Sequence, residues 1–459
     1  MKEFFSDLIK VNSIKSTPTD NAPFGQAIRN ALDVFLDKAK SLGFKTHDEN
    51  GYYGWAEYGM GESMLALACH IDIVPATGKW NTNPFELVNK DGVLYGRGVA
   101  DDKGAIVVAL ALLDYLKTNE IALKHRVRVI VGCDEESGSE CLQKYVKVDE
   151  IPAFTLVPDA DFPVVNSEKG IYHLTLSSSL SLKDEIAEIY GGERPNIVCD
   201  KVFARIKKDG VIGKFIAQNG IENTLNCSKI TDTLSRFSVN AKDITIKEEN
   251  DFYVVSAFGI ASHAMCPENG DNAITKLLAF IYAFENELNL SVLGNLLTKV
   301  CSKDIAKKLC IDCADNESGA LTINLGIIRF DGEKLTLTFD SRLPLCAKKD
   351  RIKDALYHAL GQVETVSSHY SPHLYIPETS PTIQALLSAY KDVMNEEGKC
   401  IKLGGGTYAR ALPNAVAYGP CFAGFETDIH NANEKIRVSD LENAFEIYKK
   451  AILTLDKIL

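Results

Sequence analysis

Three largely apolar runs in the first part of the chain constrain its fold most strongly. They span residues 64–69, 127–133 and 154–157. Between the first two lies GRGVADDKGAIVVALALLDYLK, in which a glycine-rich loop leads into an apolar helix beginning near Gly104. Such runs are typical of strands buried on both faces, and strands alternating with helices favour a parallel sheet. The sequence therefore predicts an α/β fold with a central, largely parallel sheet flanked by helices.

The length of 459 residues predicts at least two domains, because single cores stop growing well below this size. The pattern changes near residue 168, where strands become mixed with shorter helices, and the first pattern resumes after IPETSP. The segments that carry this change are strands at 171–177, 252–258 and 334–340 and helices at 271–287 and 350–360. We predict one domain formed by residues 1–167 and 377–459, with a large α+β domain inserted at 168–376.

Composition excludes several classes of partner. The formal net charge is -12 and no run of Lys or Arg occurs, so we expect binding to neither nucleic acid nor an anionic membrane surface. No stretch of about 18 apolar residues is present, and the charged N-terminus lacks the apolar core of a signal peptide. The 12 cysteines are scattered along the chain, several of them inside apolar runs such as LALACH, as is usual for reduced, buried thiols. These features predict a cytoplasmic protein.

Acidic residues and histidines follow the apolar runs at the points where the predicted strands end. His70 follows the first run, Glu135 and Glu136 follow the second, and Asp159 follows the third. Active sites of parallel sheets lie at the carboxyl ends of the strands, so these side chains are expected to converge. Taken singly, each has a plainer explanation as a surface or loop residue. Their convergence is what a two-metal hydrolase requires.

Three further features support a metal site. The three adjacent acids in CDEESGS would repel one another without a cation. Asp101 and Asp102, adjacent in the sequence, precede the apolar helix, where they are either ligands or helix-capping acids. His430, in GFETDIHNANE, is another candidate ligand. Asp72, two residues after His70, is the expected carboxylate partner of that imidazole.

The motifs HIDIVP, GRGVADDKG, CDEESGS, PDADFP and ETDIHNANE resemble, in order and spacing, a two-metal exopeptidase and deacylase family. That family includes carnosinase, acetylornithine deacetylase and the bacterial dipeptidase peptidase V, and the long insertion is most similar to peptidase V. The resemblance implies a catalytic domain with an inserted lid domain and two divalent metal ions, zinc or manganese. It implies that Asp102 bridges the ions and that Glu135 is the general base. His70 and Asp159 would complete one site, and Glu136 and His430 the other.

The insertion also carries motifs that resemble substrate-binding segments of this family. By that resemblance His263 stabilises the oxyanion, Asn196 approaches the substrate, and Arg342 binds the substrate carboxylate. Cysteine stands after Val198 and after Met265, where relatives often have proline or a small residue. The run KLGGGTYAR is either a simple turn or a backbone nest for the same carboxylate, formed by Gly405, Gly406 and Thr407.

The resemblance implies a metal-dependent dipeptidase acting on short, unblocked peptides. A long lid that supplies the oxyanion histidine in cis implies a catalytically complete monomer. Two alternatives stay open: an N-acyl amino-acid deacylase with the same ligands, and a non-catalytic peptide- or metal-binding relative. The second would be expected to lack a ligand or the base.

Overall fold

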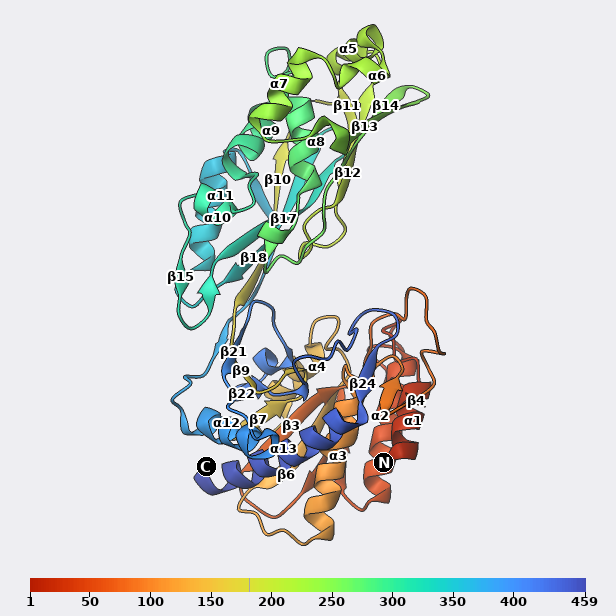
Figure 1. Ribbon diagram of the computed structural model, residues 1–459, viewed down its shortest axis with the longest axis vertical. Coiled ribbons are helices and arrows are strands. Elements are labelled where there is room, and N and C mark those ends of the chain that lie inside the picture. Colours follow the sequence, from red (N-terminus) through yellow and green to blue (C-terminus); the bar gives the residue numbers. More distant parts are fainter. Residues whose placement is uncertain (181) are drawn as a thin grey trace. The chain divides into compact units, whose positions relative to one another are not determined.

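The computed structural model describes residues 1–180 and 182–459, and these form two compact units. Unit 1 comprises Met1–Glu168 and Leu374–Leu459, and unit 2 comprises Lys169–His373. The first part of the chain (red to orange in Figure 1) and the last part (blue) therefore build one unit together. Each unit has its own hydrophobic core.

The nine-stranded sheet of unit 1 has four parallel strands at its centre. In spatial order these are β6 (Arg126–Gly132), β3 (Met64–His70), β7 (Phe154–Val157) and β22 (Ala415–Ala417). The outer strands are β1 (Lys45–Asp48), β2 (Tyr53–Tyr58), β9 (Val164–Glu168), β20 (Leu374–Tyr375) and β21 (Cys400–Leu403). The α/β class is confirmed, but the sheet as a whole is mixed, because β1, β2, β9 and β20 pair antiparallel.

Helices cover this sheet and bury its apolar side chains. The predicted apolar helix is α3 (Lys103–Thr118), which packs on β2, β3 and β6, and the closing helix α13 (Val438–Ile458) packs on α3. The other helices are α1 (Lys2–Lys10), α2 (Gln26–Ser41), α4 (Glu140–Val148), α12 (Pro381–Met394) and the 3-10 helix η4 (Tyr408–Ala411). Small sheets are formed by β4 (Val88–Lys90), β5 (Val93–Tyr95) and β24 (Lys435–Arg437), and by β8 (Ala160–Asp161) and β23 (Pro420–Cys421).

The parallel strands fix where the chain leaves the sheet. The last residue of β3, His70, is in register with Gly132 at the end of β6, and the neighbouring β7 ends at Val157. Because parallel strands end at a common edge, the segments that follow them begin side by side. These segments are Cys133–Glu136 and Pro158–Asp159, so the fold itself collects the predicted site residues.

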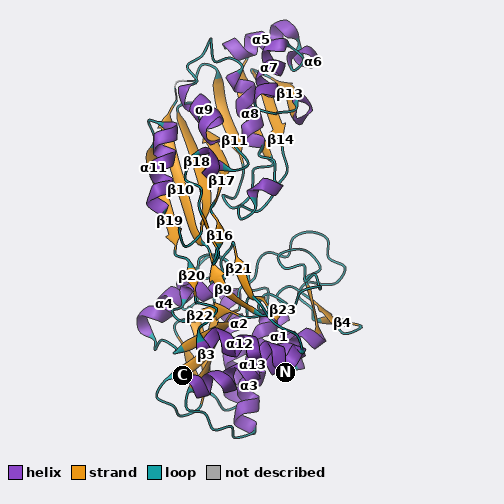
Figure 2. Ribbon diagram, turned by 60° about the vertical axis from the view of Figure 1, so that its left-hand side comes forward, coloured by secondary structure: helices purple, strands orange, loops and turns teal. Residues whose placement is uncertain are grey.

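Unit 2 contains an eight-stranded antiparallel sheet with helices packed along it (Figure 2). The sheet order is β13 (Ile244–Glu249), β14 (Phe252–Phe258), β12 (Lys201–Lys207), β11 (Ile186–Gly191), β17 (Thr322–Phe330), β18 (Lys334–Leu343), β10 (Gly170–Ser179) and β19 (Glu364–Ser371). The helices are α5 (Val211–Asn219), α6 (Ile221–Thr224), α7 (Ser228–Arg236), α8 (Ala273–Tyr282), α9 (Ser291–Asn295), α10 (Ile305–Lys308) and α11 (Lys349–Leu360). Short elements are η1 (Ala241–Asp243), η2 (Pro267–Asn269), η3 (Leu296–Val300), β15 (Ala314–Asp315) and β16 (Gly319–Ala320). Strand β12 alternates buried and less buried side chains, as expected when helices cover one face of a sheet.

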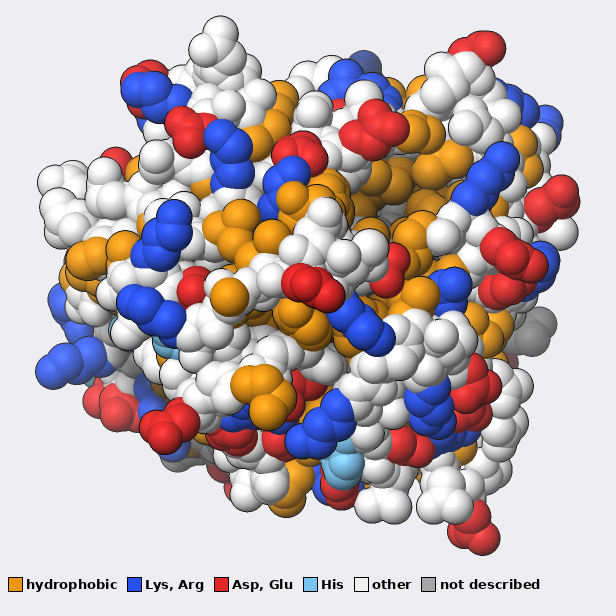
Figure 3. All heavy atoms as spheres, turned by 90° about the horizontal axis from the view of Figure 1, so that it is seen from below, with side chains coloured by type: hydrophobic (Ala, Val, Ile, Leu, Met, Phe, Trp, Pro, Cys, Tyr) orange, Lys and Arg blue, Asp and Glu red, His pale blue; other side chains and the backbone are white. Residues whose placement is uncertain are grey.

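Among the described residues, no helix is both long and apolar enough to cross a membrane. On the face shown in Figure 3, acidic and basic side chains are intermixed and do not segregate into regions of one sign.

Candidate metal centre

His70 ends the buried strand β3 and is itself fully buried. Its Nδ1 lies 3.0 Å from the backbone oxygen of Asp72, and its Nε2 lies 2.8 Å from Oδ1 of Asp101. Burial would lower the pKa of His70, but the Asp101 and Asp72 carboxylates outweigh burial and raise that pKa well above its usual value. The carboxylates that favour a protonated His70 would also favour a metal cation bound at Nε2.

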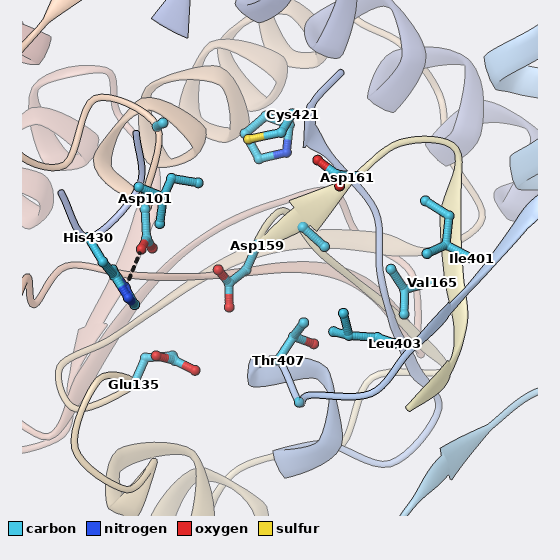
Figure 4. A pocket seen from close by; sticks show the side chains of 15 residues that line it. Asp101, Glu135, Asp159, Asp161, Val165, Ile401, Leu403, Thr407, Cys421 and His430 are labelled. Carbon is cyan, nitrogen blue, oxygen red and sulfur yellow. Dashed lines mark ion pairs between the residues drawn. The ribbon is translucent and has the colours of Figure 1, made fainter. Parts of the chain in front are cut away.

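Asp101 is the residue that joins the site together. Its Oδ2 lies 3.0 Å from Nε2 of His430 (Figure 4). That nitrogen in turn lies 3.1 Å from Oε1 of Glu136. Two groups of potential ligand atoms result, each with all its atoms within 4.8 Å of one another: His70, Asp101 and Asp159, and Asp101, Glu136 and His430. The carboxylate shared by both groups is that of Asp101.

Asp102, expected from the sequence to bridge the ions, belongs to neither group. Its side chain is fully buried, with Oδ2 accepting the backbone N–H of His70 at 3.1 Å and Oδ1 lacking any hydrogen-bond partner. It stands at the N-cap of α3 but makes no side-chain cap hydrogen bond. The geometry thus corrects the shared carboxylate from Asp102 to its neighbour Asp101, because the loop turns Asp101 towards both histidines.

Asp72 partners His70 as expected and has a second role. Nδ1 of His70 lies 3.0 Å from the backbone oxygen of Asp72 and 3.5 Å from its carboxylate, which forms an ion pair with the imidazole. The two carboxylate oxygens also each accept a backbone N–H at 3.1 Å, one from Glu135 and one from Glu136. Asp72 therefore fixes the backbone that carries both glutamates.

Glu135 and Asp159 line a cavity of about 320 Å³ together with Asp101 and His430 (Figure 4). Within the described part of the chain, the Glu135 carboxylate forms no hydrogen bond or ion pair. Burial and the nearby Asp159 carboxylate raise the pKa of Glu135 well above its usual value. Burial and Asp101 likewise raise the pKa of Asp159 to about 7. For both carboxylates, burial and the neighbouring carboxylates outweigh the opposing effect of the His70 charge.

The donor set fits a pair of divalent cations. Each group combines imidazole nitrogen with carboxylate oxygen, which are ligands of zinc and manganese alike. No Lys or Arg stands among the described residues that line the cavity. Carboxylates held this close raise one another's pKa unless a cation lies between them. Cations at these two positions would relieve the repulsion between carboxylates that raises the pKa values of Asp159 and Glu135.

The glycine-rich segment is held by the chain's own carboxylates. Thr407 donates its N–H and its hydroxyl to the buried Glu168, and Tyr408 donates its N–H to Asp159 at 3.4 Å. The backbone oxygen of Gly405 accepts a hydrogen bond from Arg410 at 2.9 Å, and an added Cβ on Gly406 would meet the same guanidinium. The amides of Thr407 and Tyr408 are thus already engaged, which weakens the expectation of a nest for a substrate carboxylate.

Unit 2 brings its three predicted residues into one neighbourhood. Ala264 donates its N–H to the backbone oxygen of Asn196 at 2.8 Å, and Ile197 forms a β-bridge with His263. Nδ1 of His263 accepts the N–H of Met265 at 3.1 Å. The ring proton of neutral His263 is therefore on Nε2, which faces away from that contact.

Arg342 is less free than the sequence suggested. Its Nε and Nη2 bind both oxygens of the fully buried Asp340, at 2.6 and 2.9 Å, and Asp340 also contacts Nε2 of His173 at 2.8 Å. A guanidinium has five N–H groups, so those not bound to Asp340 can still meet a ligand. Burial and the nearby Arg342 charge lower the pKa of His263, which favours its neutral form.

Sequence reasoning missed Glu434, the last residue of the quoted motif ETDIHNANE. This side chain is fully buried and accepts hydrogen bonds from the backbone N–H groups of Gly98, Ala100 and Asp101 and from Arg97 Nη1. A lone acid in a loop gives no sign of such a role. It holds the segment that presents Asp101.

Imidazoles and carboxylates gathered at the carboxyl edge of a parallel sheet, with an unpaired glutamate beside them, define a metallohydrolase of the α/β class. Comparison with protein families narrows this class. Residues 66–454 match the model of "Peptidase family M20/M25/M40". Because the match covers most of the chain, the protein belongs to this family of peptidases.

Relatives and solved structures agree with this assignment. The chain is 32% identical over 464 residues to "Putative dipeptidase YtjP" of Bacillus subtilis, covering 98% of this chain and 96% of that one. A Staphylococcus aureus protein of the same descriptive name is 30% identical, with 98% and 95% covered. An M20 family metallo-carboxypeptidase from Sulfolobus solfataricus has a TM-score of 0.58 at 17% identity, covering 100% of this chain and 99% of that one. Human carnosine dipeptidase 1 has a TM-score of 0.57 at 14% identity, covering 100% and 96%. At these identities the structural likeness shows a shared fold.

Proposed function

We propose that the protein is a dipeptidase that uses two divalent cations, zinc or manganese, to hydrolyse short unblocked peptides. The observation that carries this proposal is the pair of ligand groups that share the Asp101 carboxylate. His70 and Asp159 complete one group, and Glu136 and His430 complete the other. Bound at these positions, two such cations would polarise the peptide carbonyl and lower the pKa of the attacking water.

Glu135 is the proposed general base. Its carboxylate faces the cavity without a partner among the described residues, while its backbone N–H is anchored by Asp72 at 3.1 Å. A carboxylate held in this way can take a proton from the attacking water and deliver the same proton to the leaving amine. The anchored backbone keeps the Glu135 side chain in a fixed position during both transfers.

The residues of unit 2 are proposed to act on the substrate. The proton on Nε2 of neutral His263 suits it to donate a hydrogen bond to the tetrahedral oxyanion. Arg342, oriented by Asp340, is proposed to bind the C-terminal carboxylate of the substrate, and Asn196 to contact its backbone. The names of the relatives support a dipeptide as the substrate. Monomeric state and cytoplasmic location stay predictions.

The test is hydrolysis of a matched substrate panel by the metal-loaded protein. We expect L-Ala-L-Ala to be cleaved with a higher kcat/KM than N-acetyl-L-alanine, and activity to vanish after chelation and return with zinc or manganese. Cleavage of N-acetylated amino acids in preference to dipeptides would establish the deacylase alternative instead.

A Glu135→Gln variant tests the mechanism separately. General-base catalysis typically contributes about 10²- to 10⁴-fold, so kcat should fall by that order while the metal content stays at two ions per chain. Glu140→Gln removes an exposed carboxylate at the start of α4 and should leave kcat unchanged. Undiminished turnover by Glu135→Gln would refute the assignment of the base.

A further inference from the structure

The cavity at the candidate metal centre has two chemically different regions, both formed by unit 1. Carboxylates and His430 line one region, and the apolar side chains of Val165, Ile401 and Leu403 line the other. In the view of Figure 4, Asp161 is drawn next to Cys421, above both Asp159 and these apolar residues. Asp161 lines the cavity but belongs to neither group of potential metal ligands, which distinguishes it from Asp101 and Asp159.

The backbone of Asp161 is fixed on both sides. Strand β8 pairs in parallel with β23, with Ala160 donating its N–H to Gly419 and Phe162 donating its N–H to Cys421, each at 2.8 Å. The ring of Phe162 packs against Tyr418, with ring centroids 4.9 Å apart. Asp161 is therefore held on a rigid support next to a buried aromatic cluster.

The Asp161 side chain is left without a partner by the described residues. It forms no hydrogen bond or ion pair with any of them, and it is in neither group of potential metal ligands. By contrast, Asp101 contacts two histidines and Asp159 accepts a backbone N–H. Asp161 is itself exposed, so its carboxylate is open to a ligand while its backbone is held in place. An unpaired carboxylate so placed on the wall of a substrate cavity is suited to a cationic group of the ligand.

We propose that Asp161 binds the α-ammonium group of the substrate and thereby selects dipeptides with a free amino terminus over N-acyl amino acids. This inference rests on the proposed dipeptidase function and assigns its substrate class to one residue. The α-nitrogen of a dipeptide is two covalent bonds from the carbonyl carbon under attack, so its anchor must lie close to the metal ligands. Asp161, two residues after Asp159, meets that requirement. The apolar wall formed by Val165, Ile401 and Leu403 would then contact the side chain of the N-terminal residue.

The experiment compares L-Ala-L-Ala with propionyl-L-alanine, which has the same skeleton and lacks only the amino group. For the metal-loaded wild-type protein we expect a kcat/KM ratio of roughly ten to a hundred in favour of L-Ala-L-Ala, the range typical of one charged hydrogen bond. The Asp161→Asn variant should lose this factor on L-Ala-L-Ala and keep the wild-type rate on propionyl-L-alanine. Metal content should stay at two ions per chain.

Two further variants sharpen the comparison. Asp161→Glu keeps the negative charge and should retain part of the preference for L-Ala-L-Ala. Glu442→Gln removes an exposed carboxylate of α13 that does not line the cavity, and should leave both rates unchanged.

The inference is overturned if Asp161→Asn hydrolyses L-Ala-L-Ala at the wild-type rate, or if it loses the same factor on both substrates. It is also overturned, with no variant needed, if the wild-type protein cleaves both substrates equally well. Failure of the proposed function gives a different result, because the wild-type protein would then hydrolyse no dipeptide at all.

Discussion

Glu434 offers the sharpest test of how the metal site is built. Its fully buried carboxylate accepts the N–H groups of Ala100 and Asp101 through Oε1, at 2.9 and 3.2 Å. Its Oε2 accepts the N–H of Gly98 at 3.0 Å and Arg97 Nη1 at 2.6 Å. A Glu434→Gln substitution keeps the shape and one oxygen. In one orientation its amide NH₂ faces the donors of Gly98 and Arg97. In the other orientation the NH₂ faces the N–H groups of Ala100 and Asp101.

The expected loss follows from the buried ion pair. Arg97 is 1% exposed, and removing one partner of a buried pair costs about 3 to 5 kcal/mol because the other charge stays uncompensated. Arg97 also reaches the backbone oxygen of Asn431 at 3.1 Å, which moderates the cost and favours the lower half of this range. For a domain of this size each kcal/mol lowers Tm by roughly 2 to 4 °C, so a loss of about 3 to 4 kcal/mol should lower Tm by about 6 to 16 °C.

The chain offers a built-in reporter for this measurement. Its two tryptophans, Trp55 and Trp80, both belong to unit 1, and Arg97 lies 5.3 Å from the ring of Trp80. Urea unfolding followed by tryptophan fluorescence therefore reports on the unit that contains the site. Glu446→Gln is the control, because Glu446 pairs with Lys449 at the surface of α13 with its own side chain 46% exposed, and surface pairs contribute at most about 1 kcal/mol.

A functional loss should accompany the loss of stability. Residues that orient metal ligands typically change metal affinity by about 10- to 100-fold when mutated, so Glu434→Gln should weaken zinc binding by that factor. If the variant unfolds with the wild-type midpoint and binds zinc with the wild-type Kd, then the Asp101 loop does not depend on Glu434 and the reasoning is refuted.

Two other predictions concern the ligands and the substrate. Asp101→Asn should reduce metal content and abolish turnover, whereas Asp102→Asn, whose amide oxygen can still accept the N–H of His70, should retain both metals. Metal analysis of the two purified variants checks this, and the opposite ranking would return the shared carboxylate to Asp102. Amidation of the C-terminus of L-Ala-L-Ala should lower kcat/KM roughly 10- to 100-fold if Arg342 binds that carboxylate. Changing the substrate is preferable to changing Arg342, because Arg342 also neutralises the buried Asp340; equal rates on the acid and the amide would contradict the assignment.

The sequence predicted where the site lies better than it predicted which groups contact one another within it. His70, the pair Glu135 and Glu136, and Asp159 were located because each follows a buried strand, and the ends of parallel strands meet at one edge of the sheet. That inference needs only hydrophobic pattern and chain direction. It does not depend on the conformation of any loop.

The choice between Asp101 and Asp102 shows where such reasoning ends. The two acids are adjacent in the sequence, and which one faces the histidines depends on the conformation of the loop that carries them. That loop is held by Glu434, which is 333 residues from Asp101 along the chain. No local pattern encodes such a contact. Asp72 shows the same limit, because its carboxylate pairs with the imidazole as the HxD spacing suggested, but its hydrogen bonds to the backbone of the two glutamates could not be predicted from that spacing.

The residues of unit 2 were predicted from a family resemblance, and the strand pairing explains why they come together. Ile197 bridges His263, and Thr322 of β17 pairs with Arg342 of β18 while its hydroxyl binds the backbone oxygen of Ala264. A lone histidine or arginine in the sequence gives no sign of this arrangement. The antiparallel pairing brings segments far apart in the chain within reach of one another.

The C-terminal segment between β23 and β24 acts on the metal site in two ways. His430 offers a potential ligand atom, and Glu434, four residues later, accepts the backbone N–H of Asp101. Both contacts reach Asp101, that of His430 through the carboxylate and that of Glu434 through the backbone N–H. A displacement of this segment would therefore move two potential ligands at once. The two groups that share Asp101 are therefore expected to bind their cations as a coupled pair, since a cation in either group stabilises the Asp101 position that the other requires. This coupling would follow from the contacts of His430 and Glu434 with Asp101. A C-terminal segment can therefore affect a site whose other residues follow strands near the start of the chain.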